Sequence, residues 1–434
     1  MENILDAAKR VSDSAEIYIV TSEETPVQFE ANRLKNIQSK ESSQIALRIL
    51  KSGKVGYATT TGPEAGEKLL ENALETARFG ITAGFEFPAR VTYPDVKVFD
   101  PNTASFPLEG MIKICGGLVS QIKAHTPDIM CAATVRKATV AVRMMNSNGG
   151  EAGYRLSAFS IGVEGTLVRG TDMLFVGDSE SSCHPIPETK KIAENVIRQL
   201  ELAKNQASVT TGSLPVIFTP DGVASALIPS LISAFNGKTV LQGASPLIGR
   251  LGETVFDRKL NLVDDPTRPY HPCSRPCDDE AVPSQQTPLI ESGVVRNFLY
   301  DLQTAALAHT RSTSNGARGR SGQPAPSPGT FAIAADKTPF NDMIQDIKEG
   351  LLVEQLMGAA QGNILNGDFS GNVLLGYKIE NGRITGRVKD TIVAGNVFQL
   401  LKDIAAIGSD SKWVGSFLHT PSLYFPGLSV ATKP

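Results

Sequence analysis

Short segments rich in β-branched and aromatic residues, separated by turn-forming dipeptides, recur along most of this chain and constrain its fold more than any other feature. The clearest turn is Asn381-Gly382, which lies between candidate strands at residues 375–380 and 383–389. An Asn-Gly pair in this setting is a strong signal for a two-residue β-hairpin. Antiparallel sheets joined by short turns are therefore the expected framework of the molecule.

The first half of the chain combines such strands with amphipathic helices. The expected helices cover residues 4–11, 108–124 and 187–206, and a further helix begins at Pro63. The expected strands cover residues 15–20, 26–30, 44–50, 55–60, 129–136 and 139–145, followed by a long run at 154–175. This order predicts a curved antiparallel sheet with helices on one face.

The second half is richer in strands and has fewer helices. After a small polar boundary at residues 208–213, a strand at 214–219 precedes a helix that Asp221 should cap and Pro229 should kink. We therefore predict an α+β fold. An N-terminal domain, residues 1–207, layers an antiparallel sheet with helices, and a C-terminal domain, residues 213–434, is β-rich and barrel-like.

Length and composition exclude several classes of protein. A chain of 434 residues exceeds what one core usually supports, and a formal charge of −3 argues against a nucleic-acid-binding surface. No apolar run approaches membrane-spanning length, and the first ten residues do not resemble a signal peptide. Five scattered cysteines suggest free thiols in a reducing compartment. We expect a cytoplasmic protein with no membrane and no nucleic-acid partner.

A polar, glycine-containing stretch at residues 312–320 follows the candidate hairpin around Ser292-Gly293. Its donor-rich residues suit an extended peptide, a carboxylate or a phosphate, and the alternative is a solvated connection. The candidate peptide-binding residues are Ser312, Thr313, Asn315, Gly316 and Arg318.

Two groups of residues contain metal-ligand types. Cys115, Cys131 and His184 lie far apart in the sequence, so buried or surface thiols are the simpler interpretation. His271, Cys273 and Cys277, with two aspartates adjacent, have a looser spacing than paired zinc knuckles, and no second pair exists.

Two further patterns resemble catalytic motifs only in part. Asp301, His309 and Ser312 contain the residue types of a hydrolytic triad, but no nucleophile elbow surrounds the serine. Gly316-x-x-Gly319 lacks the lysine and hydroxyl residue of a phosphate-binding loop. Neither pattern predicts an active site.

Longer runs carry a family resemblance. SPLIGRLGETVFDRKLNLVDDP at residues 245–266, RPCDDEAVPSQQTPLIESGVVRNFLYDLQTA at 275–305 and STSNGARGR at 312–320 resemble the C-terminal region of the TldD/PmbA family. NRLKNIQSKESSQIALRILKSGKVGYATT at 32–60 resembles its N-terminal region. The members of this family were first described as modulators of DNA gyrase and later as metallopeptidases. The resemblance covers nearly the whole chain and implies a barrel-like C-terminal domain.

The family's metal motif is missing from this sequence. TldD-type members carry His-Glu-x-x-x-His on the helix after the first C-terminal strand, and a cysteine near the C-terminus completes the site. Each of the five histidines here is followed by Thr or Pro. The motif positions fall on about Ile228, Pro229 and Ser233, and the cysteine on about Ile407, so these positions cannot ligate zinc. The chain therefore resembles the PmbA branch, also called TldE, which lacks the ligands.

The resemblance implies a non-catalytic subunit of a metallopeptidase that degrades or processes unfolded peptides. We expect no catalytic residue, metal or cofactor in this chain, and zinc in a TldD-type partner. The partner would form a heterodimer with this chain, although a homodimer is also compatible, and an extended peptide would lie near residues 312–320 and 363–371. Two alternatives stay open: a stand-alone regulatory protein resembling a gyrase modulator, and a hydrolase with a non-metal site.

Overall fold

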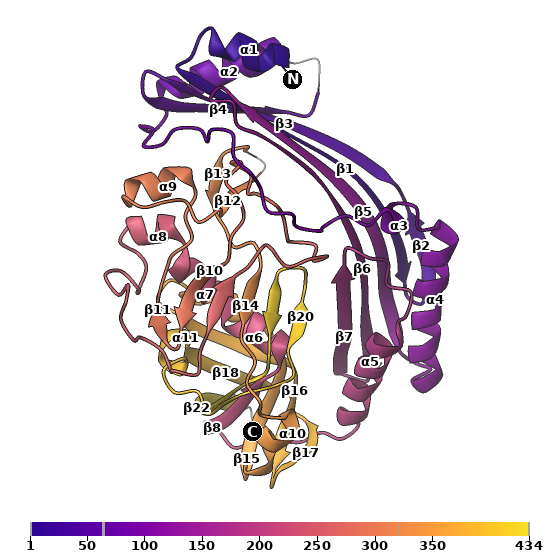
Figure 1. Ribbon diagram of the computed structural model, residues 1–434. Helices are drawn as coiled ribbons and strands as arrows, with labels where there is room; N and C mark the ends of the chain where they lie inside the picture. The colour runs from indigo at the N-terminus through magenta and orange to yellow at the C-terminus, as the bar shows by residue number, and fades with distance from the viewer. Residues whose placement is uncertain (1, 63–65, 320, 433–434) are drawn as a thin grey trace.

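The computed structural model describes residues 2–62, 66–319 and 321–432 (Figure 1). A long curved sheet built from the first half of the chain arches around one side of a β-rich body built from the second half (Figure 1). This arrangement confirms the predicted α+β fold. The expected helix start at Pro63 lies outside the described residues.

Seven strands form the curved sheet, in the order β4-β3-β1-β5-β6-β7 with β2 paired to β1, and every pairing is antiparallel. Their bounds are β1 Ser14–Glu30, β2 Arg33–Ile37, β3 Lys40–Lys51, β4 Lys54–Thr60, β5 Met130–Asn146, β6 Glu151–Arg169 and β7 Asp172–Ser182. β1 and β5 each merge two strands that the sequence predicted separately. The register between them continues through Pro26 and Arg136 without a break, because no turn residue interrupts either strand.

Helices cover the convex face of this sheet. α1 (Glu2–Lys9) and α2 (Gly66–Arg78) cover its upper end, and α4 (Leu108–His125) covers the lower end after the short α3 (Pro101–Ala104) (Figure 1). α5 (Lys190–Leu202) packs beside β7. Alternate residues of β5 point to opposite faces of the sheet. Ala133 and Val135 are buried in one cluster with Leu118 of α4, whereas Thr134 and Arg136 point to the concave side and are more exposed.

Five strands of the second half close a barrel, in the order β15-β8-β22-β18-β16, with β16 pairing back to β15. Their bounds are β8 Gly212–Phe218, β15 Glu349–Met357, β16 Asp368–Glu380, β18 Thr391–Asn396 and β22 Leu423–Thr432, and β17 (Arg383–Arg387) and β19 (Ala406–Ile407) attach to them. The β16–β17 turn is Asn381-Gly382, with φ angles of 48° and 74°. These left-handed angles are the ones that the predicted hairpin turn requires.

A second sheet packs beside the barrel, in the order β11-β10-β9-β14-β21-β20. Its strands are β9 Leu262–Asp264, β10 Thr287–Glu291, β11 Val294–Val295, β14 Phe331–Ile333, β20 Lys412–Val414 and β21 Leu418–Thr420, and a separate ribbon pairs β12 Gly316–Arg318 with β13 Pro324–Pro326. The remaining helices are α6 Pro220–Ala226, α7 Ile228–Phe235, α8 Gly237–Leu241, α9 Leu302–Leu307, α10 Phe340–Gln345, η1 Ala359–Gln361 and α11 Val397–Leu400.

The helix predicted after β8 is two helices, α6 and α7. Pro229 stands in the first turn of α7, where its missing N–H breaks the helical ladder rather than only bending it. The expected cap at Asp221 is wrong. Thr219 is the N-cap, its Oγ1 accepts the N–H of Gly222, and Asp221 lies in the first turn of α6.

Two hydrophobic clusters show how the halves meet. The largest cluster lies wholly within the second half. Another joins α4 and α5 to Ile217, Leu352 and Tyr377 of the barrel, so the halves share a core at their lower end. No named strand of the curved sheet pairs with a strand of the second half in the described ranges. None of the helices in these ranges is both long and apolar enough to cross a membrane.

Candidate functional site: the cleft between the two halves

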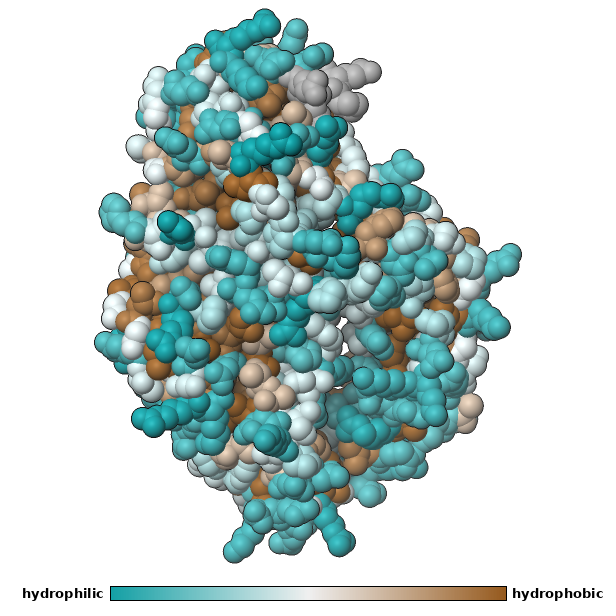
Figure 2. Space-filling view, in the orientation of Figure 1, coloured by the Kyte–Doolittle hydropathy of each residue, from teal (hydrophilic) through white to brown (hydrophobic). Residues whose placement is uncertain are grey.

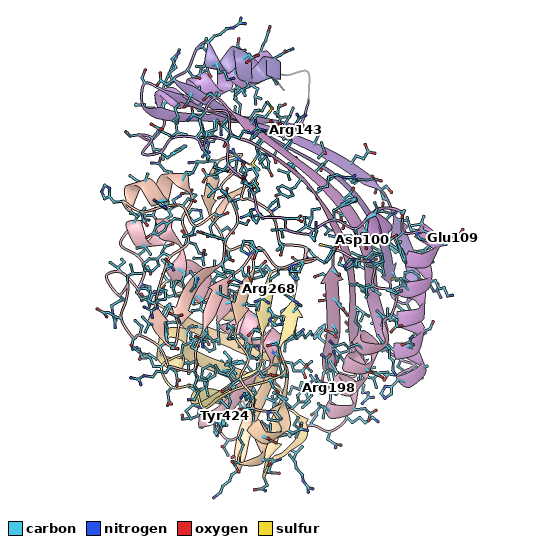
Figure 3. The ribbon with its side chains drawn as sticks, viewed as in Figure 1. Asp100, Glu109, Arg143, Arg198, Arg268 and Tyr424 are labelled. Carbon is cyan, nitrogen blue, oxygen red and sulfur yellow. The ribbon has the colours of Figure 1, made fainter. Side chains whose placement is uncertain are left out.

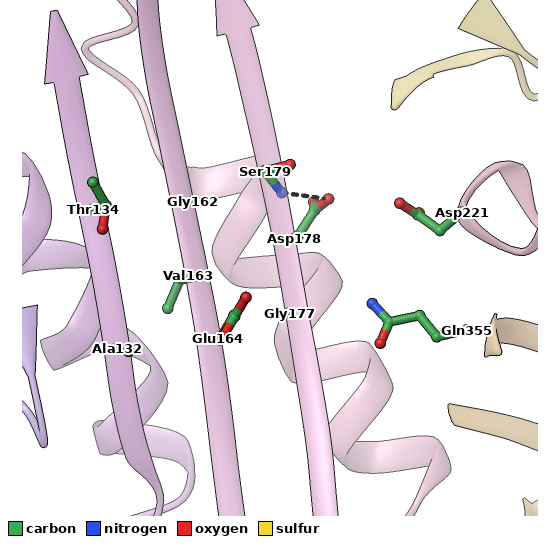
Figure 4. Close-up of a pocket in the computed structure, with 10 residues that line it drawn as sticks. All are labelled: Ala132, Thr134, Gly162, Val163, Glu164, Gly177, Asp178, Ser179, Asp221 and Gln355. Carbon is green, nitrogen blue, oxygen red and sulfur yellow. Dashed lines mark hydrogen bonds between the residues drawn. The ribbon is translucent and has the colours of Figure 1, made fainter. Parts of the chain in front are cut away.

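A cleft separates the concave face of the curved sheet from the second half of the chain. Two adjoining cavities of about 410 and 490 Å³ form it, and both are lined by Thr134, Gly162 and Ser179. Figure 2 shows a narrow opening between the two parts, and Figure 4 shows the strands on one side facing Asp221 and Gln355 on the other. We call this space the inter-half cleft.

Small side chains give the sheet side of the cleft its shape. The floor carries Ala138, Ala158, Ser160 and Gly162 on neighbouring strands β5 and β6. Gly177 of β7 has no room for a side chain, since a β-carbon there would lie 2.8 Å from the carbonyl oxygen of Val163. A flat sheet with short side chains leaves space for an extended chain without deep specificity pockets.

A lysine between two carboxylates bridges the cleft. Nζ of Lys412, from β20, lies 2.5 Å from Asp178 of β7 and 3.2 Å from Asp221 of α6. Burial lowers the pKa of Lys412, but the charges of both carboxylates outweigh burial, and the net pKa is raised. Asn195 of α5 also donates to Asp178 at 2.7 Å. The lysine therefore links a strand of the curved sheet to the second half of the chain through two ion pairs.

Two further contacts tie the halves together below the cleft. Glu354 of β15 accepts hydrogen bonds from Arg198 and Gln199 of α5 at 2.8 and 2.9 Å (Figure 3 labels Arg198). Burial raises the pKa of Glu354, and Arg198 opposes that rise. Arg387 of β17 pairs with Asp172 of β7 at 3.1 Å. These contacts flank the shared core and hold the lower end of the cleft closed.

A buried ionic cluster ties the halves together above the cleft, and we call it the upper junction. Arg48 of β3 contacts Glu16 of β1 at 3.1 Å and Glu280 of the second half at 2.5 Å. Arg318 of β12 pairs with the same Glu16, and its N–H donates to Asp279 at 2.8 Å. The side chains of Arg48, Glu16, Glu280 and Arg318 are each 3% exposed or less.

Residues 312–318, predicted to bind peptide, form part of the upper junction and of the buried interior next to it. Ser314 and Asn315 are fully buried, and Asn315 donates to Asp264 at 2.6 Å and to the carbonyl of Ser327 at 3.0 Å. The N–H of Gly316 donates to Asp278 at 2.9 Å. The expectation of bare donors on this loop is therefore wrong, because the chain itself uses these donors.

The other two residues of that stretch are half-buried. Ser312 Oγ and Thr313 Oγ1 both donate to the carbonyl of Tyr300, at 3.1 and 3.3 Å, and Thr313 Oγ1 also approaches Asn315. The structure thus brings all five candidate residues into one loop. A peptide-binding role for them stays a prediction, and it would require these internal contacts to open.

The positions of the family's metal motif do not fit zinc in this chain. Ile228 and Ile407 are buried in the same hydrophobic cluster, and Pro229 lies in the first turn of α7. Ser233 is half-buried and is the only one of the four with a side-chain oxygen. Zinc needs thiolate, imidazole or carboxylate ligands, and these four side chains offer none.

The other candidate metal ligands are not assembled either. Burial raises the pKa of Cys273 and Cys277, and the ring of His271 stacks on Trp413 with a centroid distance of 3.4 Å. Burial and the nearby Arg268 lower the pKa of His271 to about 4. Within the described ranges, no three His, Cys, Asp or Glu side chains are arranged to hold a metal ion.

The candidate metal ligands of the first half are not brought together either. Cys115 and Cys131 are buried thiols on α4 and β5, and burial raises the pKa of each. His184 instead pairs with Asp100 at 2.7 Å, at the upper end of β7 (Figure 3 labels Asp100).

The partial catalytic motifs do not form sites. Asp301 caps α9 by accepting the N–H and the hydroxyl of Thr304, at 2.7 and 2.6 Å. His309 is exposed, and Ser312 donates to the backbone. Gly316 packs against the carboxylate of Glu280, and its N–H donates to Asp278, so this N–H is not free to bind an anion.

Sequence reasoning missed the residues of the inter-half cleft. Asp178, Asp221 and Lys412 come from a strand, a helix start and a short edge strand, and 234 positions separate Asp178 from Lys412. No local motif marks any of them. The small residues Ala132 and Ala138 of β5 and Ala158, Ser160 and Gly162 of β6, at alternate positions, give a sequence signal for an open sheet face.

Comparison with known proteins gives the family. The model described as PmbA/TldA metallopeptidase C-terminal domain matches residues 211–432, and the model described as PmbA/TldA metallopeptidase domain 1 matches residues 15–77. The chain is 26% identical to protein MJ0231 of Methanocaldococcus jannaschii over 433 residues, which covers 98% of this chain and 99% of that protein. It is 23% identical to metalloprotease PmbA of Escherichia coli O157:H7, which covers 98% and 94%.

Solved structures share the whole fold. TldE of Thermococcus kodakarensis superposes with a TM-score of 0.89 at 22% identity and covers 99% of both chains. A Thermotoga maritima protein described as a modulator of DNA gyrase superposes with a TM-score of 0.88 at 22% identity, also over 99% of both chains. The matched domains and the full-length relatives together show that the chain belongs to the PmbA/TldD metallopeptidase family.

Proposed function

We propose that this chain is a non-catalytic, TldE-like subunit that pairs with a TldD-type metallopeptidase and forms one wall of a chamber for unfolded peptides. The observation that carries the proposal is the donor set at the motif positions. Isoleucine, proline, serine and isoleucine stand where a metallopeptidase of this family needs two histidines, a glutamate and a cysteine. Zinc and the activated water would come from the partner.

The inter-half cleft is the surface that we assign to the peptide. The centre of its sheet side carries the short side chains of Ala138, Ala158, Ser160 and Gly162, and the ion pairs of Lys412 with Asp178 and Asp221 join the two walls. An extended peptide in such a cleft would be held through its main chain and by shape, with little dependence on its sequence. The stretch at residues 312–318 lies at the upper junction, where its polar groups are bonded internally.

Purified chain, alone and mixed with a TldD-type sibling, tests the proposal. We expect the chain alone to leave an unfolded peptide intact and to contain no stoichiometric zinc by elemental analysis, and we expect a chelator to leave its thermal stability unchanged. The mixture should cleave the peptide, and EDTA should stop it. Cleavage by the pure chain in EDTA would instead favour the alternative of a hydrolase with a non-metal site.

A matched pair of substitutions tests the wall. Ala158→Trp places an indole in the inter-half cleft, whereas Ala141→Trp places one on the opposite, convex face of the same sheet. We expect Ala158→Trp to weaken peptide cleavage by the mixture at least about tenfold and Ala141→Trp to leave it near the parent value. Equal effects would remove the cleft from the proposal.

Assembly is tested separately. A stable pair should bury at least about 1,000 Å². Light scattering should therefore detect a heterodimer when the sibling is added. Only monomers in the mixture would favour the second alternative, a stand-alone regulatory protein. All five cysteines are free thiols, which fits the reducing cytoplasm that we propose as its compartment.

A further inference from the structure

The upper junction contains more buried carboxylates than cations. Its guanidinium groups belong to Arg48, Arg275 and Arg318. The carboxyl groups that face them belong to Glu16, Asp264, Asp278, Asp279, Glu280 and Asp301. Among the residues that the structure describes, three guanidinium groups thus face six carboxyl groups in a largely buried region. Such an excess is costly unless a proton or a cation compensates part of it.

The excess of carboxyl groups over cations is greatest at Asp278 and Glu280, which are both fully buried. Asp278 accepts three backbone N–H groups, from Glu280, Val282 and Gly316, at 2.9 Å each, and it has no ion pair of its own. Glu280 accepts the N–H of Leu302 at 2.7 Å in addition to its contact with Arg48.

The electrostatics agree with this geometry. Burial raises the pKa of Asp278 to about 6, against the opposing charge of Arg275. Burial also raises the pKa of Glu280 to about 7, against the opposing charge of Arg48, and the charges of Asp278 and Asp301 add to the rise. Near neutral pH these two neighbouring carboxyl groups therefore hold about one proton between them.

We propose that the upper junction is a proton-linked latch, in which one proton held by Asp278 and Glu280 keeps the curved sheet closed on the second half of the chain. The backbone from 278 to 282 carries both carboxyl groups, so their mutual repulsion after proton loss acts on one short loop. That loop packs on the sheet through Cys277 and Ala281, which share a cluster with Met144 and Ala152. Moving the loop away from the sheet admits water and relieves the repulsion.

The direction of the pH effect follows from linkage. The closed junction binds a proton that the open, hydrated junction releases, so acid favours the closed form and rising pH favours the open form. The change falls between the ordinary carboxyl pKa near 4.5 and the raised value of about 7.

Burial also raises the pKa of Asp264, against the hydrogen bond from Asn315, whereas the other groups named here keep their charge state in this range. Burial raises the pKa of Tyr18, Tyr154 and Cys277, and it raises the pKa of Tyr93 to about 12, so all four stay neutral. The three arginines stay charged.

The consequence for the molecule extends beyond the junction. β5 and β6 run from the upper junction, where Met144 and Ala152 contact the loop, to the inter-half cleft, where Thr134 and Gly162 line the cavity. A sheet released at its upper end can therefore change the width of the cleft.

Hydrogen–deuterium exchange of the full chain at pH 5.5 and 7.5 tests the latch, after correction for the intrinsic pH dependence of exchange. We expect peptides that cover residues 278–282, 300–304 and 316–318 to open on the order of tenfold more at pH 7.5. Unchanged protection at the two pH values would overturn the proposal, and so would greater opening at pH 5.5.

Substitutions identify the proton site. Glu280→Gln keeps the acceptor for Arg48 and removes the repulsion between the two carboxylates, so this variant should stay closed at pH 7.5 and show a smaller pH dependence, which comes from Asp278 alone. Glu354→Gln is the matched control, because Glu354 is also buried against an arginine but lies at the lower end of the cleft. A pH response in Glu280→Gln equal to that of the parent would exclude Glu280 as the site.

A measurement on the unaltered chain covers the case in which the variant does not fold. The infrared spectrum of the parent should contain a band from a buried protonated carboxyl group at pH 5.5, and this band should disappear as the pH rises to 8. Its absence at pH 5.5 would also overturn the proposal.

Discussion

The upper junction and the inter-half cleft both bring charged side chains of the two halves together, yet they differ in how much water reaches them. At the junction, Arg48, Glu16 and Glu280 are at most 3% exposed. At the cleft, Lys412 is 26% and Asp221 37% exposed, beside a cavity of about 410 Å³. The same residue types therefore stabilise the fold at the junction, where they are buried, and stay accessible to solvent at the cleft.

Covering segments cause the difference. Over the junction, the segment from 79 to 100 places Phe85 and Phe87 against the guanidinium of Arg48, with centroid distances of 4.8 and 5.0 Å. The loop around Ala281 closes the concave side of the sheet there. The lower sheet has no such cover. The centre of its concave face carries alanine, serine and glycine, and Asp221, Gln355, Pro272 and the β20–β21 hairpin line the cleft opposite it.

The largest effect should come from removing one of the two carboxyl partners of Arg48 at the junction. Glu280→Ala leaves Arg48 buried with only Glu16, and loss of one partner of a buried pair costs about 3–5 kcal/mol. Asp221→Ala, at the more exposed contact of the cleft, should cost less than about 1 kcal/mol. Chemical denaturation of the two variants beside the parent measures both. Equal losses would mean that the two regions do not differ as the burial of their charges indicates.

A second substitution tests how far buried hydrogen bonds stabilise residues 312–318, the stretch that the sequence predicts to bind peptide. Asn315→Ala removes three side-chain hydrogen bonds, with Asp264, Ser327 and Thr313, and Asp264 loses one of its donors. We expect a loss of about 2–3 kcal/mol in the free energy of unfolding. Arg311→Ala, at the exposed start of the same loop, should change stability by less than about 0.5 kcal/mol. If Asn315→Ala left stability unchanged but weakened peptide cleavage by the mixture, the original interpretation of the loop would regain support.

This loop shows where sequence reasoning succeeds and where it stops. Hairpins such as Asn381-Gly382 and the break at Pro229 follow from local chemistry, so they could be predicted. Whether a polar residue faces water or the interior depends on what the rest of the chain places over it. Asn315 is buried because Asp264, 51 positions away, requires a donor, and no local pattern contains that information.

Sequence reasoning likewise succeeds for one part of the candidate site and fails for another. The lack of metal ligands at Ile228 and Pro229 could be read directly, because a missing residue type needs no structure. The cleft could not be predicted from the sequence, because Asp178, Asp221 and Lys412 meet only after the sheet has curved around the second half.

A smaller effect should follow from removing the cation of the cleft. Lys412→Met keeps the length of the side chain but leaves Asp178 with Asn195 as its remaining side-chain donor among the contacts described above. We expect a loss of about 1 kcal/mol, measured by chemical denaturation, because Lys412 is partly solvated and its ion pairs are screened. A loss as large as that of Glu280→Ala would show that the cleft contact is as tightly fastened as the junction.

The smallest effect should come from the rim between the two regions, where His184 pairs with Asp100. The hydrogen bond from His184, helped by the N–H of Asn102, holds the pKa of Asp100 below its ordinary 3.8. A carboxyl group whose folded pKa is depressed adds stability above its unfolded pKa, and this stability is lost as the pH falls through the lower, folded value. Asp100→Asn keeps an acceptor for Asn102, so it should cost only a few tenths of a kcal/mol near pH 6, and the difference from the parent should vanish in strong acid. Denaturation midpoints of parent and variant at several pH values measure this. A difference that persists at the lowest pH would mean that packing at the rim, and not the charge of Asp100, provides the stability.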